Sequence, residues 1–117
     1  MPGTKFTLAH QKNANSLLFR ALEYLGGKHG LLIVRELMYG EKRFSELEHA
    51  TGINTRTLTL RLEELRNSKV IGRRVTDDTP PQAIYMITEK GAELENIIDD
   101  LRKWAEKWPV EKDADTL

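Results

Sequence analysis

The stretch that decides the fold runs from Phe44 to Ser68 and reads FSELEHATGINTRTLTLRLEELRNS. Its first part predicts a short helix over residues 44–50, in which Ser45 and Glu48 have the spacing of a capping box. Gly52 ends this helix, because glycine adopts the left-handed conformation that follows many helices without a Cβ penalty. A short turn then leads into a second apolar pattern.

The second part of the stretch predicts a helix from the N-cap Asn54 to about Ser68. Leu58, Leu62 and Leu65 form one narrow apolar stripe, because residues spaced by three and four lie on the same helix face. Two short helices joined by a glycine-containing turn are the sequence form of a helix-turn-helix, a pattern that other helical hairpins share.

Two β-prone segments follow the helix pair. They cover residues 70–75 and 83–87, and the sequence Asp-Asp-Thr-Pro-Pro at 77–81 forms a turn or loop between them. A helix-turn-helix followed by a β-hairpin predicts a winged helix-turn-helix. The expected fold is therefore mainly α, in the α+β class, with a small β-hairpin wing.

Further helices are predicted before this unit. Apolar residues from 17 to 25 recur at helical spacing after the N-cap residue Asn15, and Gly26-Gly27 ends that first helix. Residues 31–38 form a second helix that is apolar around most of its circumference and ends at Gly40, as is typical of the central helix of a small core.

The last predicted helix runs from Thr88 to Trp108, about 30 Å at 1.5 Å per residue, before Pro109. Its apolar face ends in Trp104 and Trp108, which either pack on the chain's own core or lie in an interface, where aromatic residues are favoured. The interface is the preferred interpretation, because a compact winged domain does not need this extra length. The predicted contacts of a two-fold dimer are Leu18, Leu22, Leu94, Ile97, Ile98, Leu101, Trp104 and Trp108.

The chain of 117 residues fits one domain. We expect a flexible N-terminal arm at 1–14, the winged domain with its flanking dimerisation helices at 15–109, and an acidic C-terminal tail at 110–117. The absence of cysteine excludes disulfides, thiolate zinc sites and thiol-based redox sensing. No segment has the roughly 18 apolar residues of a membrane span or the pattern of a secretory signal, so a cytoplasmic location is expected.

Charge is balanced only over the whole chain, which has 18 basic and 18 acidic side chains. Residues 1–75 hold 13 basic and 7 acidic side chains, whereas residues 76–117 hold 5 and 11, so the net charges are +6 and −6. The basic excess accompanies the predicted helix-turn-helix and favours a nucleic-acid partner, although surface charge also serves to solubilise helix faces.

The face of the 54–68 helix opposite the leucine stripe holds the candidates for reading bases. The N-terminal half of the second helix of a helix-turn-helix enters the major groove. Arg can bond guanine N7 and O6 together, and Thr can bond a base or a phosphate. Leu60 either contacts a thymine methyl or is an ordinary exposed leucine. The candidates are Thr55, Arg56, Thr57, Thr59 and Leu60.

Polar and basic residues around this face are predicted to contact phosphates. They lie beside the N-terminus of the 44–50 helix, on the 54–68 helix and on the first wing strand. Each one, taken singly, is explained equally well as a solvated surface group. The predicted phosphate contacts are Lys42, Arg43, Ser45, Arg61, Arg73 and Arg74.

Five segments resemble, in order and spacing, the HxlR-type family of winged helix-turn-helix regulators, which are relatives of the MarR-type repressors. The resemblance covers about Leu22 to Trp108 and implies a homodimeric prokaryotic transcriptional regulator that dimerises through its first and last helices. The segments are GGK at 26–28, LLIVREL at 31–37, KRFSEL at 42–47, LTLRLEEL at 58–65 and YMITEKG at 85–91.

Three features depart from the family pattern. Many members carry a cysteine before the first helix that senses oxidants, whereas this chain has none. His29 stands where the family usually has Trp, and we interpret it as a packing position. Pro80-Pro81-Gln82 replaces the common Pro-Pro-Arg, so the wing tip is less basic, and phosphate binding would depend more on Arg73, Arg74 and the helices.

The expected function is that of a sequence-specific regulator of transcription, a repressor, that binds an inverted-repeat operator in double-stranded DNA as a homodimer. The alternative is a winged-helix module for protein–protein contact without specific DNA binding. His10, His29 and His49 lack the close spacing of metal ligands, and no catalytic motif is found, so no enzyme, metal or cofactor is expected. A small-molecule effector is compatible with the sequence, which does not identify one.

Overall fold

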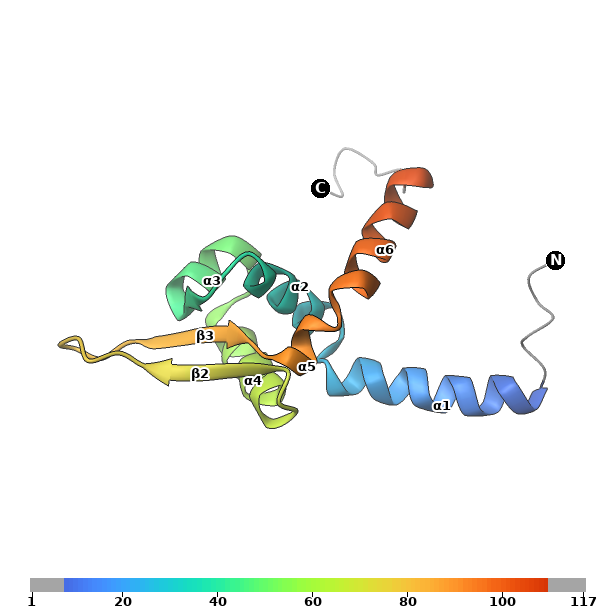
Figure 1. Cartoon of the computed structure of the whole chain (residues 1–117), viewed down its shortest axis with the longest axis horizontal. Helices are drawn as coiled ribbons and strands as arrows, with labels where there is room; N and C mark the ends of the chain where they lie inside the picture. Colours follow the sequence, from blue (N-terminus) through green and yellow to red (C-terminus); the bar gives the residue numbers. More distant parts are fainter. Residues whose placement is uncertain (1–7, 110–117) are drawn as a thin grey trace.

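The computed structural model describes residues 8–109, so the first part of the predicted arm (1–7) and the predicted tail (110–117) lie outside the described residues. Six helices and a small antiparallel sheet make up the described part (Figure 1). The elements are α1 (Leu8–Tyr24), α2 (Gly27–Met38), β1 (Lys42–Arg43), α3 (Phe44–Thr51), α4 (Thr55–Asn67), β2 (Ile71–Val75), β3 (Ala83–Ile87), α5 (Glu89–Ala92) and α6 (Glu95–Lys107).

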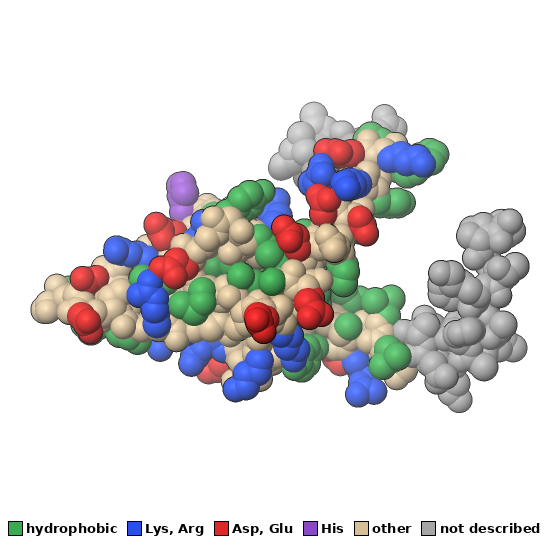
Figure 2. All heavy atoms as spheres, viewed as in Figure 1, with side chains coloured by type: hydrophobic (Ala, Val, Ile, Leu, Met, Phe, Trp, Pro, Cys, Tyr) green, Lys and Arg blue, Asp and Glu red, His purple; other side chains and the backbone are tan. Residues whose placement is uncertain are grey.

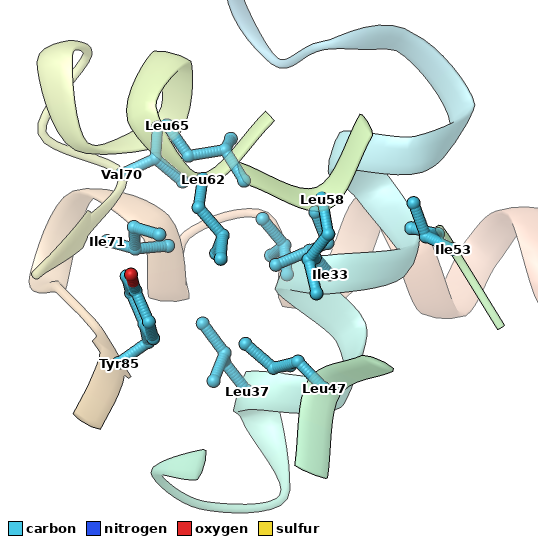
Figure 3. Close-up of a cluster of buried hydrophobic side chains, with 11 residues drawn as sticks. Ile33, Leu37, Leu47, Ile53, Leu58, Leu62, Leu65, Val70, Ile71 and Tyr85 are labelled. Carbon is cyan, nitrogen blue, oxygen red and sulfur yellow. The ribbon is translucent and has the colours of Figure 1, made fainter. Parts of the chain in front are cut away.

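The core lies where α2, α3 and α4 meet the sheet (Figure 3). The leucine stripe of α4 is buried as predicted, in one cluster with Ile33, Val34 and Leu37 of α2. Burial of one such side chain stabilises the fold by about 1.5–3 kcal/mol. The core residues are Ile33, Val34, Leu37, Leu47, Ile53, Leu58, Leu62, Leu65, Val70, Ile71 and Tyr85.

Both ends of α4 are capped. The Asn54 side chain accepts a hydrogen bond of 2.9 Å from the Thr57 backbone N–H, which confirms the predicted N-cap. At the other end, the backbone N–H of Lys69 donates to Arg66 O and that of Val70 donates to Leu65 O. This is the Schellman arrangement, and it places Lys69 in the left-handed region with a φ of 67°.

The predicted hairpin is confirmed as β2 and β3, and a third strand joins it. The strand order is β1-β3-β2, with Lys42 opposite Tyr85 and Arg73 opposite the same tyrosine on the other side. The sequence analysis missed β1, because two residues are too few to show an alternating pattern.

The predicted start of the first helix and the predicted cap of the third helix are wrong. α1 begins at Leu8, so residues 8–14 belong to a helix and not to an arm, and Asn15 is not its N-cap. These residues contain neither glycine nor proline to stop the helix. α3 begins one residue after Arg43, whose backbone N–H donates 2.8 Å to Glu46 Oε1, so the predicted capping box of Ser45 and Glu48 is replaced by one further upstream.

The predicted single helix from Thr88 to Trp108 is also wrong, because it is divided into α5 and α6. Thr88 is the N-cap of α5, and its Oγ1 accepts a hydrogen bond from the Gly91 N–H. Gly91 approaches the backbone closely: a Cβ there would lie 2.2 Å from Val70 O. α5 is therefore seated tightly against the residue that precedes β2, and α6 leaves in a new direction after it.

α1 and α6 project from the body at the end opposite the wing (Figure 1). The radius of gyration is 16.9 Å, against about 13 Å for a compact domain of this length. Leu94 and Ile98 are half-buried against the chain's own core, but Trp104 and Trp108 are 57% and 61% exposed. The indoles therefore do not pack on the core of their own chain. Among the described residues, none of the helices is long and apolar enough to span a membrane.

Two leucines of α4 provide a matched test of this core. Leu62 is 1% exposed and Leu60 is 48% exposed, so Leu62→Ala should lower the free energy of unfolding by about 2–5 kcal/mol, whereas Leu60→Ala should change it by less than about 0.5 kcal/mol. Urea unfolding followed by circular dichroism, at one protein concentration, measures both. Equal losses would contradict the orientation of α4 described here.

Candidate nucleic-acid interface

The exposed face of α4 lies directly opposite its buried leucines. Arg56 and Leu60 are both exposed on it, on the first half of the helix, close to the Asn54 cap. In the part of the chain that the structure describes, no carboxylate lies within ion-pair distance of the Arg56 guanidinium. Figure 2 shows basic side chains along the lower edge of the body, where Figure 1 places α4. This face therefore offers a donor-rich side chain beside an apolar one.

The three threonines of this face are less available than their sequence pattern indicates. Thr55 Oγ1 donates to a carboxylate oxygen of Glu48, which ties α4 to α3. Thr59 Oγ1 donates 2.8 Å to Thr55 O within the helix, and Thr57 is half-buried. With their hydroxyl hydrogens committed, Thr55 and Thr59 can still accept hydrogen bonds but not donate them. Among the candidates for reading bases, Arg56 and Leu60 are thus the exposed side chains that no hydrogen bond or ion pair within the described chain restrains.

Arg61 occupies a different position from the other predicted phosphate contacts. Its Nη1 lies 2.8 Å from Glu64 Oε1, and the side chain lines a groove against the turn between α1 and α2. A Cβ on Gly26 would lie 3.1 Å from Arg61 Cδ, so the arginine stem packs against this turn. Arg61 is therefore not among the phosphate contacts that we propose.

The two arginines of β2 also differ in whether a carboxylate pairs with them. Successive side chains of a strand leave on opposite faces, and Arg73 shares the face of its partner Tyr85, which packs in the core beside the helices. Arg74 leaves on the other face, where its guanidinium is paired with Glu41. Arg73 therefore lies on the side of the sheet that carries the helices, with its charge unpaired by any described carboxylate.

The remaining predicted phosphate contacts gather where β1 meets α3. Lys42 is half-buried on β1, whereas Arg43 and Ser45 are exposed at the N-terminus of α3, whose free backbone N–H groups favour anions. Sequence reasoning missed the roles of Glu41 and Glu48. Arg74 lies 33 residues from Glu41, and Thr55 lies on a different helix from Glu48, so that only the fold brings each pair together.

The described residues offer few features that would indicate a metal-binding or catalytic site. Within residues 8–109, no group of three His, Asp or Glu side chains is arranged to hold a metal ion. The clearest electrostatic perturbation lies on the polar face of α6, where hydrogen bonds from Arg102 and Lys103 lower the pKa of Asp99. This network is remote from the α4 face, and it leaves the opposite, apolar face of α6 in solvent (Figure 2).

Comparison with known families agrees with this geometry. The model of the HxlR-like helix-turn-helix family matches residues 24–113, which include the helix pair, the wing and α6. The chain belongs to the HxlR-like helix-turn-helix family. It is accordingly a transcriptional regulator of the helix-turn-helix type, with a winged-helix fold.

Curated relatives of this HxlR-like protein occur in bacteria and archaea. It is 36% identical over 89 residues to the HTH-type transcriptional regulator YodB of Bacillus subtilis, covering 75% of this chain and 80% of YodB. An uncharacterised HTH-type transcriptional regulator of Methanothermobacter thermautotrophicus is 37% identical over 89 residues, which are 75% of this chain and 68% of the relative.

Solved structures of the family share the fold. A structure described as an HTH-type transcriptional regulator, ytcD, superposes with a TM-score of 0.73 at 38% identity, over 78% of this chain and 94% of that one. The oxidised form of the redox regulator HypR gives a TM-score of 0.71 at 32% identity, over 83% and 98%. The HxlR-like protein described here has no cysteine, so thiol oxidation cannot act as a sensor in it.

Arg73 and Arg74 test the assignment of the wing strand. If Arg73 neutralises a phosphate, Arg73→Ala should weaken binding to all duplexes alike and reduce the slope of log K against log salt by about 1. Arg74→Ala should change the slope less, because Arg74 is paired with Glu41. Fluorescence anisotropy over a salt series measures both slopes, and a larger change for Arg74→Ala would reverse the assignment.

Proposed function

We propose that this HxlR-like protein is a sequence-specific repressor that binds an inverted-repeat operator in double-stranded DNA as a homodimer. The single observation that carries the proposal is the face of α4, where Arg56 and Leu60 remain exposed opposite a fully buried leucine stripe. An arginine can bond the N7 and O6 of a guanine together, and a leucine can contact the methyl group of a thymine. Together they would distinguish base pairs in the major groove.

Phosphate contacts would position the helix. Donors are supplied by Arg43 and Ser45 at the start of α3, by Lys42 on β1 and by Arg73 on β2. Such contacts hold a protein in register on the duplex without reading its sequence. The −6 net charge of residues 76–117 belongs to the wing loop, the last helices and the tail, so repulsion from DNA would keep this part at a distance.

Dimerisation is supported by apolar surface that the described part of the chain leaves uncovered. More than half of the side chain is exposed at Ile97, Leu101 and Trp104 of α6 and at its C-cap Trp108, and Leu18 and Leu22 of α1 are exposed too. A monomer rarely exposes such a continuous apolar surface. A two-fold dimer built on these helices would present two α4 helices to successive major grooves, about 34 Å apart, and would repress by occupying the operator.

Salt separates this proposal from protein–protein binding. A DNA-binding protein that neutralises roughly 6–10 phosphates should lose about 10³–10⁵ in affinity between 50 and 200 mM salt. The experiment selects bound duplexes from a random pool at low salt and then titrates the selected duplex over the salt series. A protein that binds no duplex at low salt, or binds with no salt dependence, would instead fit the protein-interaction module.

Arg56 and Arg66 form a matched pair on α4, at its first and last turns. Arg56→Ala should weaken binding to the selected duplex by about 1–3 kcal/mol and relax the preference at one base pair, whereas Arg66→Ala removes the same charge with a smaller, sequence-independent effect. Competition between the selected duplex and single-base variants measures the preference. If Arg56→Ala weakens all duplexes equally, Arg56 contacts a phosphate and not a base.

Trp104 on the apolar face of α6 and its neighbour Lys103 on the polar face test the dimer. Trp104→Ala should raise the dimer dissociation constant about thirty-fold or more, because buried tryptophans at interfaces are worth about 2 kcal/mol or more. Lys103→Ala loses only an exposed ion pair with Asp99 and should leave the constant nearly unchanged. Sedimentation velocity over a dilution series decides, and equal constants for the wild type and Trp104→Ala would contradict this interface.

A further inference from the structure

Three segments that are distant in sequence meet at one backbone oxygen. Ser68 is the C-cap of α4, and its carbonyl oxygen accepts hydrogen bonds from Tyr24 OH at 3.0 Å and from Lys90 Nζ at 2.7 Å. Lys90 Nζ also donates 2.6 Å to Tyr24 OH, which closes a triangle. We call these three residues the Ser68 cluster. Tyr24 is the last residue of α1, and Lys90 lies in α5, which leads into α6.

The carbonyl groups of the next two residues, Lys69 and Val70, are hydrogen-bonded by Thr88. Thr88 Oγ1 lies 2.6 Å from Lys69 O and 2.9 Å from Val70 O, and the Thr88 N–H donates to Val70 O. The Lys90 ammonium also sits at the C-terminal end of α4, where the helix dipole favours a positive charge. The end of the helix that carries Arg56 is thus fastened to the segment that leads into α6.

The direction of α1 depends on the Ser68 cluster more than the position of α5 does. This helix is joined to α2 through Gly26 and Gly27, both at positive φ, and a groove lined by Phe19, Leu22, Arg61 and Glu64 separates it from α4. Among the side chains that the structure describes, Tyr24 makes the hydrogen bonds between α1 and the rest of the chain. Without them, the turn of Leu25 and Gly26 and a few apolar contacts would set the direction of α1.

We propose that Tyr24 and Lys90 are positioning residues that determine the operator spacing: by joining α1 and α5 to the C-cap of α4, they fix each recognition helix relative to the dimer axis. This inference rests on the proposed function, in which α1 and α6 form the dimer and α4 reads the DNA. Two rigidly held α4 helices accept one distance between half-sites, whereas two loosely held helices accept several. The residues touch no DNA in this arrangement and act through α4.

The test uses the full-length dimer and a panel of duplexes in which the spacing of the selected inverted repeat is lengthened or shortened by one and two base pairs. Tyr24→Phe removes the phenol oxygen and keeps the ring, and Lys90→Met removes the ammonium. Each should reduce the preference for the native spacing over the altered ones by about five- to ten-fold, which is the scale of one hydrogen bond. Binding to a single half-site should not change.

Two controls separate positioning from stability. Glu89→Gln changes the charge of the neighbouring residue on α5 without touching Ser68 O, and Lys90→Arg keeps a cationic donor, so both should retain the preference. The dimer dissociation constant is measured for every variant. A loss of affinity that follows dimer dissociation, or an equal loss on the half-site duplex, would overturn the inference, because the residues would then support assembly or folding only.

The outcomes also distinguish this inference from the proposed function. A wild type that binds no duplex, or binds one half-site as tightly as the repeat, refutes the dimeric operator itself. If the wild type prefers the native spacing and the Tyr24→Phe and Lys90→Met variants prefer it equally strongly, only the role of the Ser68 cluster is refuted.

Discussion

Burial of Leu58, Leu62 and Leu65 against α2 is the interaction on which the rest of the structure depends. A helix of 13 residues that buries one stripe must leave the opposite stripe in water, because both follow the same 3.6-residue period. The burial that stabilises the core therefore also determines that Arg56 and Leu60 face outward. Fold stability and the candidate DNA-reading face are two consequences of one packing arrangement.

The same core holds the base of α6 through Ile98 but leaves most of the apolar side chains of α1 and α6 exposed. α5 is held against the residue before β2 by the close approach at Gly91, and α6 then carries its tryptophans away from the core. Within the described part of the chain these tryptophans remain 57% and 61% exposed, and α1 also exposes Leu17, Leu18 and Phe19. A second copy of the chain would cover this surface most simply, since a two-fold interface is self-complementary.

Much of the fold was predictable because its signals are local. The Asn54 cap, the leucine stripe, the stop at Gly52 and the hairpin of β2 and β3 each depend on residues a few positions apart. The failures have two causes. β1 and the division between α5 and α6 depend on contacts with distant segments, Tyr85 for β1 and Val70 for α5, which no local pattern reports. The start of α1 and the Arg43 cap are local features for which the sequence also offered a competing cap residue.

The sequence by itself determined the class of fold, the faces of α4 and the family resemblance, because periodicity, caps and glycine positions act over a few residues. The tertiary contacts, in contrast, establish which of the candidate polar side chains are paired within the chain and which are available to bind DNA. The fold pairs Arg74 with Glu41 and Thr55 with Glu48, and it leaves Arg56 and Arg73 unpaired by the described carboxylates. The physical reason is that a hydrogen bond or ion pair across 33 residues exists only once folding has brought its two ends together.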